Sequence, residues 1–262
     1  MSGLDSNVHV VREGNGDALI LLHCLGVDHH FWDFAAPLCA DFAVYRYDLP
    51  GHVTSAVPTA GYDIEDLSEQ LAAIMHANNI GRANLAGVSL GGLIAQDFAA
   101  RHPALVSRLI LIDTTPRYTD HMRAMWAERA ATARDSGVAV LVDGLLKIWF
   151  SADAITKDLD GVRYVRSALS RCSGEGYALA CEALAKADLW GLAAHIKAPT
   201  LVICGDDDIQ SFLDAARWLS ANIAGAELSW IAGARHASVL EKPADAIRLM
   251  KGFLRNNPVA QT

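Results

Sequence analysis

Short runs of apolar residues recur along the chain, and they limit most strongly what it can fold into. From residue 18 onward most of these runs are nearly continuous rather than alternating, which is typical of strands buried on both faces of a mostly parallel sheet. We expect strands at Val8–Arg12, Ala18–His23, Phe42–Tyr47, Ala83–Val88, Arg108–Ile112, Thr200–Cys204 and Glu227–Ile231.

Segments with a helical spacing of apolar residues lie between these strands. The clearest are Ile64–Asn78, Gly92–His102 and Ala244–Asn256. Because strands and helices alternate, the sequence predicts an α/β fold, with a mostly parallel sheet and helices on both of its faces.

The alternation stops after "RLILIDTTP" and resumes at "APTLVICG". Between Arg117 and about Leu192 there are only helical patterns, rich in Ala, Leu, Arg and Trp. We therefore predict a core made of residues 1–116 and 193–262, interrupted by an all-helical cap of residues 117–192.

Charge and cysteine content narrow the choice of partner and compartment. The net charge of −8 argues against a nucleic acid or an anionic membrane as partner. The five cysteines are odd in number and have no CxxC spacing, and the start "MSGLDSNVHV" lacks the basic and apolar parts of a secretory signal. We expect a cytoplasmic protein with a small-molecule partner; the sequence leaves open whether it forms a homo-oligomer.

A glycine-rich stretch, GVSLG at residues 87–91, lies between a predicted strand and a predicted helix. This is the G-x-S-x-G pattern in the strand-turn-helix context that makes it meaningful. Glycines two positions before and after the serine let the turn close tightly and expose Ser89 at a helix N-terminus. The pattern predicts that Ser89 is a nucleophile.

A serine nucleophile needs a base that is oriented by a third group. His236 follows the last predicted strand and precedes the last helix, where the chain order for such a site places the base. The acid is expected after the preceding strand, where Asp206, Asp207 and Asp208 are adjacent. Asp113, at the end of "LILID", is the competing candidate.

Acyl transfer also requires donors that stabilise the oxyanion. One candidate is the backbone N–H of Leu90, the residue after the serine, and the other is the N–H of Leu25 in the loop after the second predicted strand. Gly26 allows that loop to approach closely.

The neighbouring histidines His29 and His30 raise the question of a metal site. We expect the two side chains to diverge, and no other ligand has suitable spacing. The sequence therefore predicts no metal and no cofactor.

With these residues in place, the whole chain resembles an α/β-hydrolase with an inserted helical cap. "YRYDLPGHVTS" is similar to the D-x-x-G-H-G-x-S turn of that family, and "ARHPALVSRLILIDTTP" adds to the likeness. In such hydrolases the acid usually lies three residues after the glycine that ends its strand. The resemblance thus selects Asp208 and predicts a Ser89-His236-Asp208 triad.

Within the family the chain most resembles 3-oxoadipate enol-lactonases. The likeness lies in "LGVDHHFWDFAAPL" and, in the cap, in "WFSAD" and "SGEGYALACEALAKADL". What this resemblance implies is the opening of an unsaturated lactone that carries a carboxylate. Ser89 would form an acyl-enzyme, and water activated by His236 would hydrolyse it.

Three departures separate the chain from that pattern. His23-Cys24 replaces a small polar pair, Val53 replaces the second glycine of G-H-G, and Ile148 stands where a basic residue usually precedes Trp-Phe.

These departures bear on substrate binding. A desolvated carboxylate needs a cationic partner, and we predict Lys147 for this role, with other cap arginines as alternatives. Those arginines are Arg117, Arg123 and Arg171, and the aromatic residues predicted to line the pocket are Trp32, Trp126 and Trp149.

Two other hypotheses about function compete with the lactonase hypothesis. The same site could serve another carboxylic-ester, amide or carbon–carbon bond hydrolase, because fold does not fix chemistry. A binding module without turnover is the third reading. The complete set of elbow glycines and triad residues argues against it.

Overall fold

The computed structural model describes residue 4 and residues 8–255. Within these residues, seven strands form one sheet in the order β1-β3-β2-β4-β5-β6-β7, and only β1 runs antiparallel to its neighbour. The strands are β1 Val10–Glu13, β2 Asp17–Leu22, β3 Phe42–Tyr47, β4 Ala83–Val88, β5 Val106–Ile112, β6 Thr200–Gly205 and β7 Glu227–Ile231. All seven predicted strands are confirmed: β3, β4 and β7 have the predicted bounds, and the other four differ by one or two residues at one or both ends.

The central strands are buried on both faces, as their continuous apolar sequences predict. Every residue of β4 and β6 is buried. Because β2 and β4 to β7 are parallel, the loops that follow them emerge at one edge of the sheet, and this edge brings the candidate site residues together.

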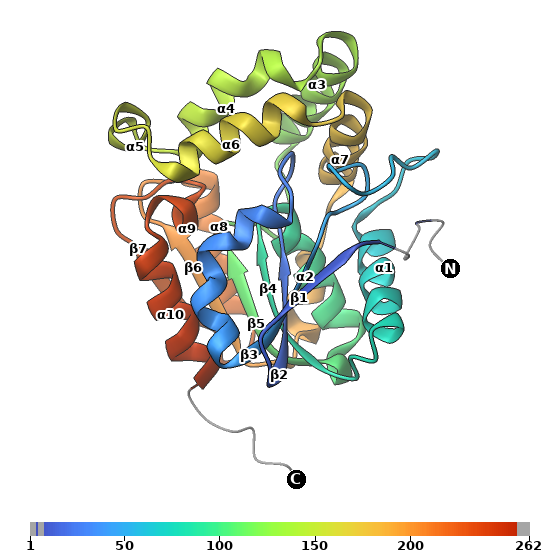
Figure 1. The fold of residues 1–262 in the computed structure, drawn as a ribbon, viewed down its shortest axis with the longest axis vertical. Helices are drawn as coiled ribbons and strands as arrows, with labels where there is room; N and C mark the ends of the chain where they lie inside the picture. The colour runs from blue at the N-terminus through green and yellow to red at the C-terminus, as the bar shows by residue number, and fades with distance from the viewer. Residues whose placement is uncertain (1–3, 5–7, 256–262) are drawn as a thin grey trace.

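Helices cover both faces of the sheet (Figure 1). One group packs side by side and comprises α1 Ile64–Ala77, α2 Leu90–Arg101, the 3-10 helix η4 Trp190–His195 and α8 Gln210–Asn222. A second pair consists of the 3-10 helix η1 His29–Ala40 and α10 Pro243–Arg255. Two short helices, η2 Pro103–Leu105 and α9 Ser238–Glu241, lie in connections. The predicted helix Ala244–Asn256 corresponds to α10, although Asn256 lies outside the described residues.

The insertion between β5 and β6 forms a helical layer beyond the carboxyl ends of the strands (Figure 1). It contains α3 Asp120–Ser136, η3 Val138–Leu141, α4 Val142–Trp149, α5 Ala152–Thr156, α6 Asp160–Arg171 and α7 Gly174–Lys186. Helix α3 packs on α7, and α4 packs on α6. The domain limits at 116/117 and 192/193 stay a prediction.

The two ends of this insertion lie side by side. Arg117 and Asp188 form an isolated antiparallel bridge, and the N–H of Leu189 donates to the carbonyl of Pro116 at 2.8 Å. The chain thus leaves and re-enters the core at one place. Over the described residues, no helix combines the length and apolar character needed to cross a membrane.

Candidate active site

Ser89 occupies a strained turn between the last residue of β4 and the first residue of α2. Its φ of +52° and ψ of −109° are rare for a residue with a side chain. A Cβ on Gly87 would collide with the carbonyl of Gly91, and a Cβ on Gly91 would collide with the carbonyl of Leu22. The two glycines are therefore required for clearance, which is the physical basis of the G-x-S-x-G pattern.

His236 lies within hydrogen-bond distance of both proposed partners. Its Nε2 is 3.2 Å from Oγ of Ser89, and its Nδ1 is 2.9 Å from Oδ2 of Asp208. Because an ionised carboxylate can only accept, Nδ1 carries the proton and donates it to Asp208. Nε2 is then the acceptor that faces the Ser89 hydroxyl. The structure brings together the three residues predicted for the triad.

The surroundings of His236 adjust its basicity. Burial lowers its pKa, but the charge of Asp208 and the hydrogen bond to it raise the pKa, and the net shift is upward. The ring centroid of Phe212 lies 4.3 Å from that of His236, and the Trp149 ring lies 6.2 Å away. The rings of Phe212 and Trp149 therefore lie close to the imidazole of His236.

Asp113, the competing acid, lies close to Asp208 but has other partners. Its Oδ1 accepts the N–H of Gly205 at 3.0 Å, and its Oδ2 accepts the N–H and hydroxyl of Ser238. Burial and then the charge of Asp208 raise the pKa of Asp113 to about 7. The hydrogen bond from His236 goes to Asp208, so the geometry favours Asp208 as the acid.

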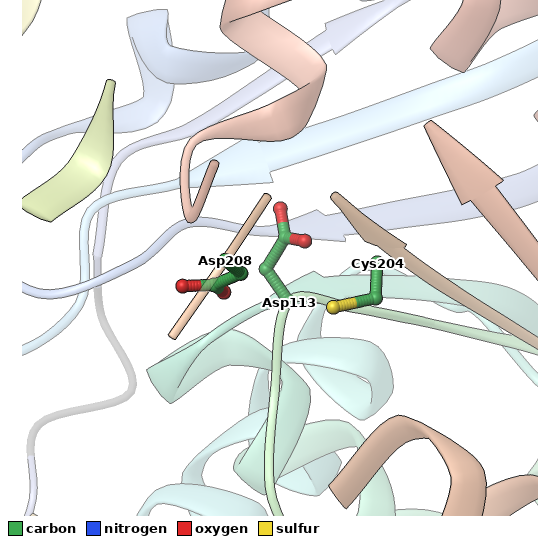
Figure 2. Close-up of side chains that lie close together, drawn as sticks. All are labelled: Asp113, Cys204 and Asp208. Carbon is green, nitrogen blue, oxygen red and sulfur yellow. The ribbon is translucent and has the colours of Figure 1, made fainter. Parts of the chain in front are cut away.

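Asp113, Asp208 and Cys204 together form a compact buried cluster (Figure 2). Their ligand-type atoms lie within 4.8 Å of one another. The carboxylates already accept hydrogen bonds from protein N–H groups, and burial raises the pKa of the Cys204 thiol, which disfavours the thiolate a metal would need. Asp113 and Asp208 take part in the hydrogen-bond network around His236, and the Cys204 thiol donates to the carbonyl of Gly205.

The two residues predicted to donate to an oxyanion, Leu90 and Leu25, belong to two segments that are in close contact. Leu90 is the first residue of α2, where backbone N–H groups have no partner within the helix. Leu25 follows β2, whose last carbonyl lies against Gly91. The β2 loop and the start of α2 are therefore in direct contact next to Ser89.

Two buried histidines, His23 and His52, hold this loop. Nε2 of His52 accepts the N–H of Gly26 at 2.9 Å, and Nε2 of His23 accepts the N–H of Leu49 at 2.9 Å. Burial lowers the pKa of each to about 4, so both rings are neutral. Sequence reasoning missed these roles, although His52 is the histidine of the "DLPGH" turn.

The structure explains why Val53 is a departure from the family pattern. Val53 has a φ of +30°, which explains why glycine is usual there.

The expectation that His29 and His30 diverge is wrong, because their ring centroids are 4.1 Å apart. Each ring instead contacts its own carboxylate, Asp48 or Asp33.

The cap is tied to the loop that carries His236. The N–H of Ala237 donates to the carbonyl of Trp149 at 2.8 Å. Glu241 accepts hydrogen bonds from the hydroxyl of Ser151 and from the N–H of Arg235. Of the predicted pocket aromatics, Trp149 is therefore the one placed beside His236.

The other predicted substrate contacts are placed differently. Trp32 is buried beside Phe31 and Phe34, and Trp126 is buried against Tyr118. Lys147 is exposed on α4, whose buried positions are Val142, Leu145, Leu146 and Trp149. The structure does not bring Lys147 into contact with Ser89, His236 or Asp208.

The three alternative cap arginines also have other surroundings. Arg117 stacks over the ring of Trp190 at 3.9 Å, Arg123 donates to the carbonyls of Ala185 and Ala187, and Arg171 is exposed. Arg129 was not among the predicted residues; it follows Trp126 by three positions and so shares its side of α3. Its guanidinium lies 4.6 Å from the centroid of the Trp126 ring, and its positive charge opposes the upward shift of the His236 pKa.

Comparisons with known proteins show which family the chain belongs to. The family model for the alpha/beta hydrolase fold matches residues 17–243. The chain is 30% identical to 3-oxoadipate enol-lactonase 2 of Acinetobacter baylyi over 238 residues, which is 90% of this chain and 88% of that protein. It is 32% identical to a pimeloyl-[acyl-carrier protein] methyl ester esterase of Chromobacterium violaceum over 258 residues, 95% of this chain and 98% of the other.

A solved structure is similar over nearly the whole chain. The enol-lactonase from Burkholderia xenovorans LB400 superimposes with a TM-score of 0.90 at 34% identity, covering 94% of this chain and 96% of that one. These findings confirm the predicted fold class and the prediction of a hydrolase. The chain belongs to the alpha/beta hydrolase fold family.

Proposed function

We propose that the chain is a serine hydrolase that cleaves a small carboxylic ester or lactone through Ser89, His236 and Asp208. The observation that carries this proposal is His236, which lies within hydrogen-bond distance of the Ser89 hydroxyl at one nitrogen and of Asp208 at the other. This is the arrangement of nucleophile, base and orienting acid that acyl transfer requires.

In the proposed first step, Oγ of Ser89 attacks the substrate carbonyl while its proton passes to Nε2 of His236. The negative charge moves to the carbonyl oxygen, where the N–H groups of Leu25 and Leu90 donate hydrogen bonds. The tetrahedral intermediate then breaks the bond to the leaving oxygen, which takes the proton from His236. In a lactone the leaving oxygen stays attached to the acyl group.

The second step hydrolyses the acyl-enzyme. Water attacks the acyl carbonyl as Nε2 of His236 accepts its proton, and the same N–H groups stabilise the oxyanion. His236 then returns the proton to Oγ of Ser89. Asp208 holds Nδ1 in its protonated form throughout and stabilises the imidazolium that forms in each step.

The proposed substrate is 3-oxoadipate enol-lactone. It is supported by the two enol-lactonases that the chain resembles, one by sequence and one by structure. The methyl ester esterase at 32% identity supports a second candidate, hydrolysis of another carboxylic ester on the same residues. A binding module without turnover fits less well, because a receptor has no use for the strained backbone at Ser89.

A cytoplasmic location is part of the proposal, and it rests on the five cysteines, all of which are free thiols.

Purified protein assayed with 3-oxoadipate enol-lactone, neutral lactones and methyl and aryl esters tests the substrate. We expect the largest kcat/KM for the enol-lactone. A larger value for a methyl or aryl ester would support the second candidate instead. Binding of these compounds with no hydrolysis of any of them would support the receptor reading.

A further inference from the structure

The residues on either side of His236 in the chain are both hydrogen-bonded to the cap. The cap segment involved is residues 147–151, where α4 ends and α5 begins, and we call it the α4–α5 corner. The N–H of Ala237 donates to the carbonyl of Trp149, in this corner, at 2.8 Å. The guanidinium of Arg235 donates to the first carbonyl of the corner at 2.7 Å. The chain on both sides of the proposed base is thus tied to the cap.

A buried carboxylate, that of Glu241, forms a third link to the corner. One of its oxygens accepts the N–H groups of Arg235 at 3.2 Å and of Ser151 at 3.3 Å, and the other accepts the hydroxyl of Ser151. The same carboxylate therefore closes the loop of residues 235–241 and joins this loop to the cap. Glu241 is only 6% exposed, so water has little access to these bonds.

The burial of Glu241 indicates a role in geometry. Removing a carboxylate from water costs free energy even when donors surround it, whereas a fully hydrogen-bonded buried polar group makes its surroundings rigid. Hydrogen bonds also weaken steeply when they are bent. The carboxylate therefore fixes the backbone of Arg235 relative to Ser151.

The position of His236 leaves little room for displacement. Its Nε2 is 3.2 Å from Oγ of Ser89, which is near the upper end of hydrogen-bond distances, and its Nδ1 must keep the 2.9 Å bond to Asp208. A misplacement of about 1 Å at a reacting group can lower the rate by about 100-fold. Groups that fix the backbone beside His236 therefore bear on turnover without touching the substrate.

We propose that Glu241 and Ser151 are positioning residues for His236, and that their hydrogen bonds make the α4–α5 corner part of the support that keeps Nε2 at the Ser89 hydroxyl. They act through the backbone of Arg235 rather than on the reacting atoms. This inference rests on the proposed function, since it takes His236 as the base. It gives the cap a role in placing the base, because a displaced corner displaces the loop of His236.

Two serines of the cap allow a matched test. Ser151 and Ser173 each cap the N-terminus of a cap helix, and their side-chain oxygens accept the N–H groups of Ala154 and Gly176, each at 3.2 Å. Alanine at either position removes one such cap, so we expect similar decreases in Tm. Of the two serines, Ser151 alone is also bonded to Glu241.

Steady-state kinetics with 4-nitrophenyl acetate distinguishes the two serine variants. We expect kcat of Ser151→Ala to fall about 10-fold while KM changes less than about threefold. The loss is partial because Asp113 still holds the loop from the core at Ser238. In Ser173→Ala we expect kcat to stay within about twofold of the parent value.

Two replacements of Glu241 add a rescue experiment. Glu241→Gln keeps an oxygen for the two N–H groups and offers its amide N–H to the oxygen of Ser151, so kcat is expected to stay within about threefold of the parent value. Glu241→Ala removes all three bonds and is expected to lower kcat at least as much as Ser151→Ala. Adding Ser151→Ala to Glu241→Ala should cause no further loss, because both changes break the same link.

NMR of protein with isotope-labelled histidine tests the positioning without a substrate. The His236 signals are identified by their loss in His236→Gln, and we expect its Nδ1 proton signal to shift or broaden in Ser151→Ala but not in Ser173→Ala. Unchanged His236 signals in Ser151→Ala, or equal losses of kcat in the two serine variants, would overturn the assignment. A parent protein that hydrolyses no ester or lactone, with His236 signals that still respond to Ser151→Ala, would refute the proposed function and leave the link between cap and His236 standing.

Discussion

The carboxylate of Asp113 accepts two hydrogen bonds from Ser238, whose N–H and hydroxyl oxygen lie 3.1 Å and 2.6 Å from Oδ2. Its other oxygen accepts the N–H of Gly205. Ser238 follows His236 by two residues, and Gly205 precedes Asp208 by three. Asp113 therefore joins the loop of the proposed base to the loop of the proposed acid.

This arrangement predicts different consequences for the two carboxylates. Asp208→Asn removes the acceptor that holds Nδ1 of His236 protonated, and we expect kcat to fall by about 10³- to 10⁴-fold. Asp113→Asn loosens two loops without touching His236, and we expect a loss of about 10-fold. Steady-state kinetics of both variants checks this; the greater loss in Asp113→Asn would reverse the assignment of the acid.

The pH dependence of turnover offers a second test. The base acts in its neutral form, so kcat/KM is expected to fall as pH drops through the pKa of His236, which lies above its ordinary value. Asp113 is one of the groups that raise this pKa. In Asp113→Asn the acidic limb is therefore expected to move to lower pH. A limb that stays in place or moves to higher pH would contradict the electrostatic account.

The close packing around the Ser89 turn predicts which glycines can be replaced by alanine. Gly91→Ala would force its Cβ into the carbonyl of Leu22, and we expect a loss of about 1–3 kcal/mol in stability together with most of the activity. Thermal unfolding and an ester assay measure the two effects.

Gly144→Ala is the matched control for that change. Gly144 lies inside α4, and an added Cβ there meets no atom within 4 Å. Alanine is favoured over glycine inside a helix by about 0.5–1 kcal/mol, so this variant is expected to be as stable as the parent or slightly more so. Equal destabilisation by both changes would refute the clearance argument.

The hydrogen bond that neutral His52 accepts from the N–H of Gly26 predicts different effects on kcat and on KM. His52→Phe leaves the N–H of Gly26 without its acceptor beside Leu25, and we expect a destabilisation of about 1–3 kcal/mol. Because Leu25 is proposed to donate to the oxyanion rather than to bound substrate, kcat should fall more than KM rises. His30→Phe, at an exposed position of η1, is the control that should change neither. An unchanged kcat in His52→Phe would remove the histidine from the support of this loop.

The sequence predicted the strands, the helices α1, α2 and α10, the helical insertion and the candidate residues Ser89 and His236 because each depends on a local pattern or on the order of elements. Continuous apolar runs specify doubly buried strands, and the clearance around Ser89 requires glycines at set positions. The order of strands then places His236 and Asp208 at the same edge of the sheet. The choice between Asp208 and Asp113 needed the resemblance, because both follow strands that end there.

The cap was harder to interpret from its sequence. Helical patterns do not state which side of a helix faces the core, so they could not show that Lys147 is exposed on α4 while Leu145, Leu146 and Trp149 are buried. The roles of His23 and His52 depend on contacts between residues 26 positions apart. The proximity of the His29 and His30 rings depends on the local backbone, which the residue pattern does not reveal.

The most direct test of the central claim is covalent labelling of Ser89. A fluorophosphonate probe reacts with a serine only when a neighbouring base activates it. We expect intact-protein mass spectrometry to show one adduct that maps to Ser89, with no adduct in Ser89→Ala and a kcat lower by about 10⁶-fold. An unlabelled Ser89 in folded protein, or an alanine variant that turns over ester at a comparable rate, would contradict the account.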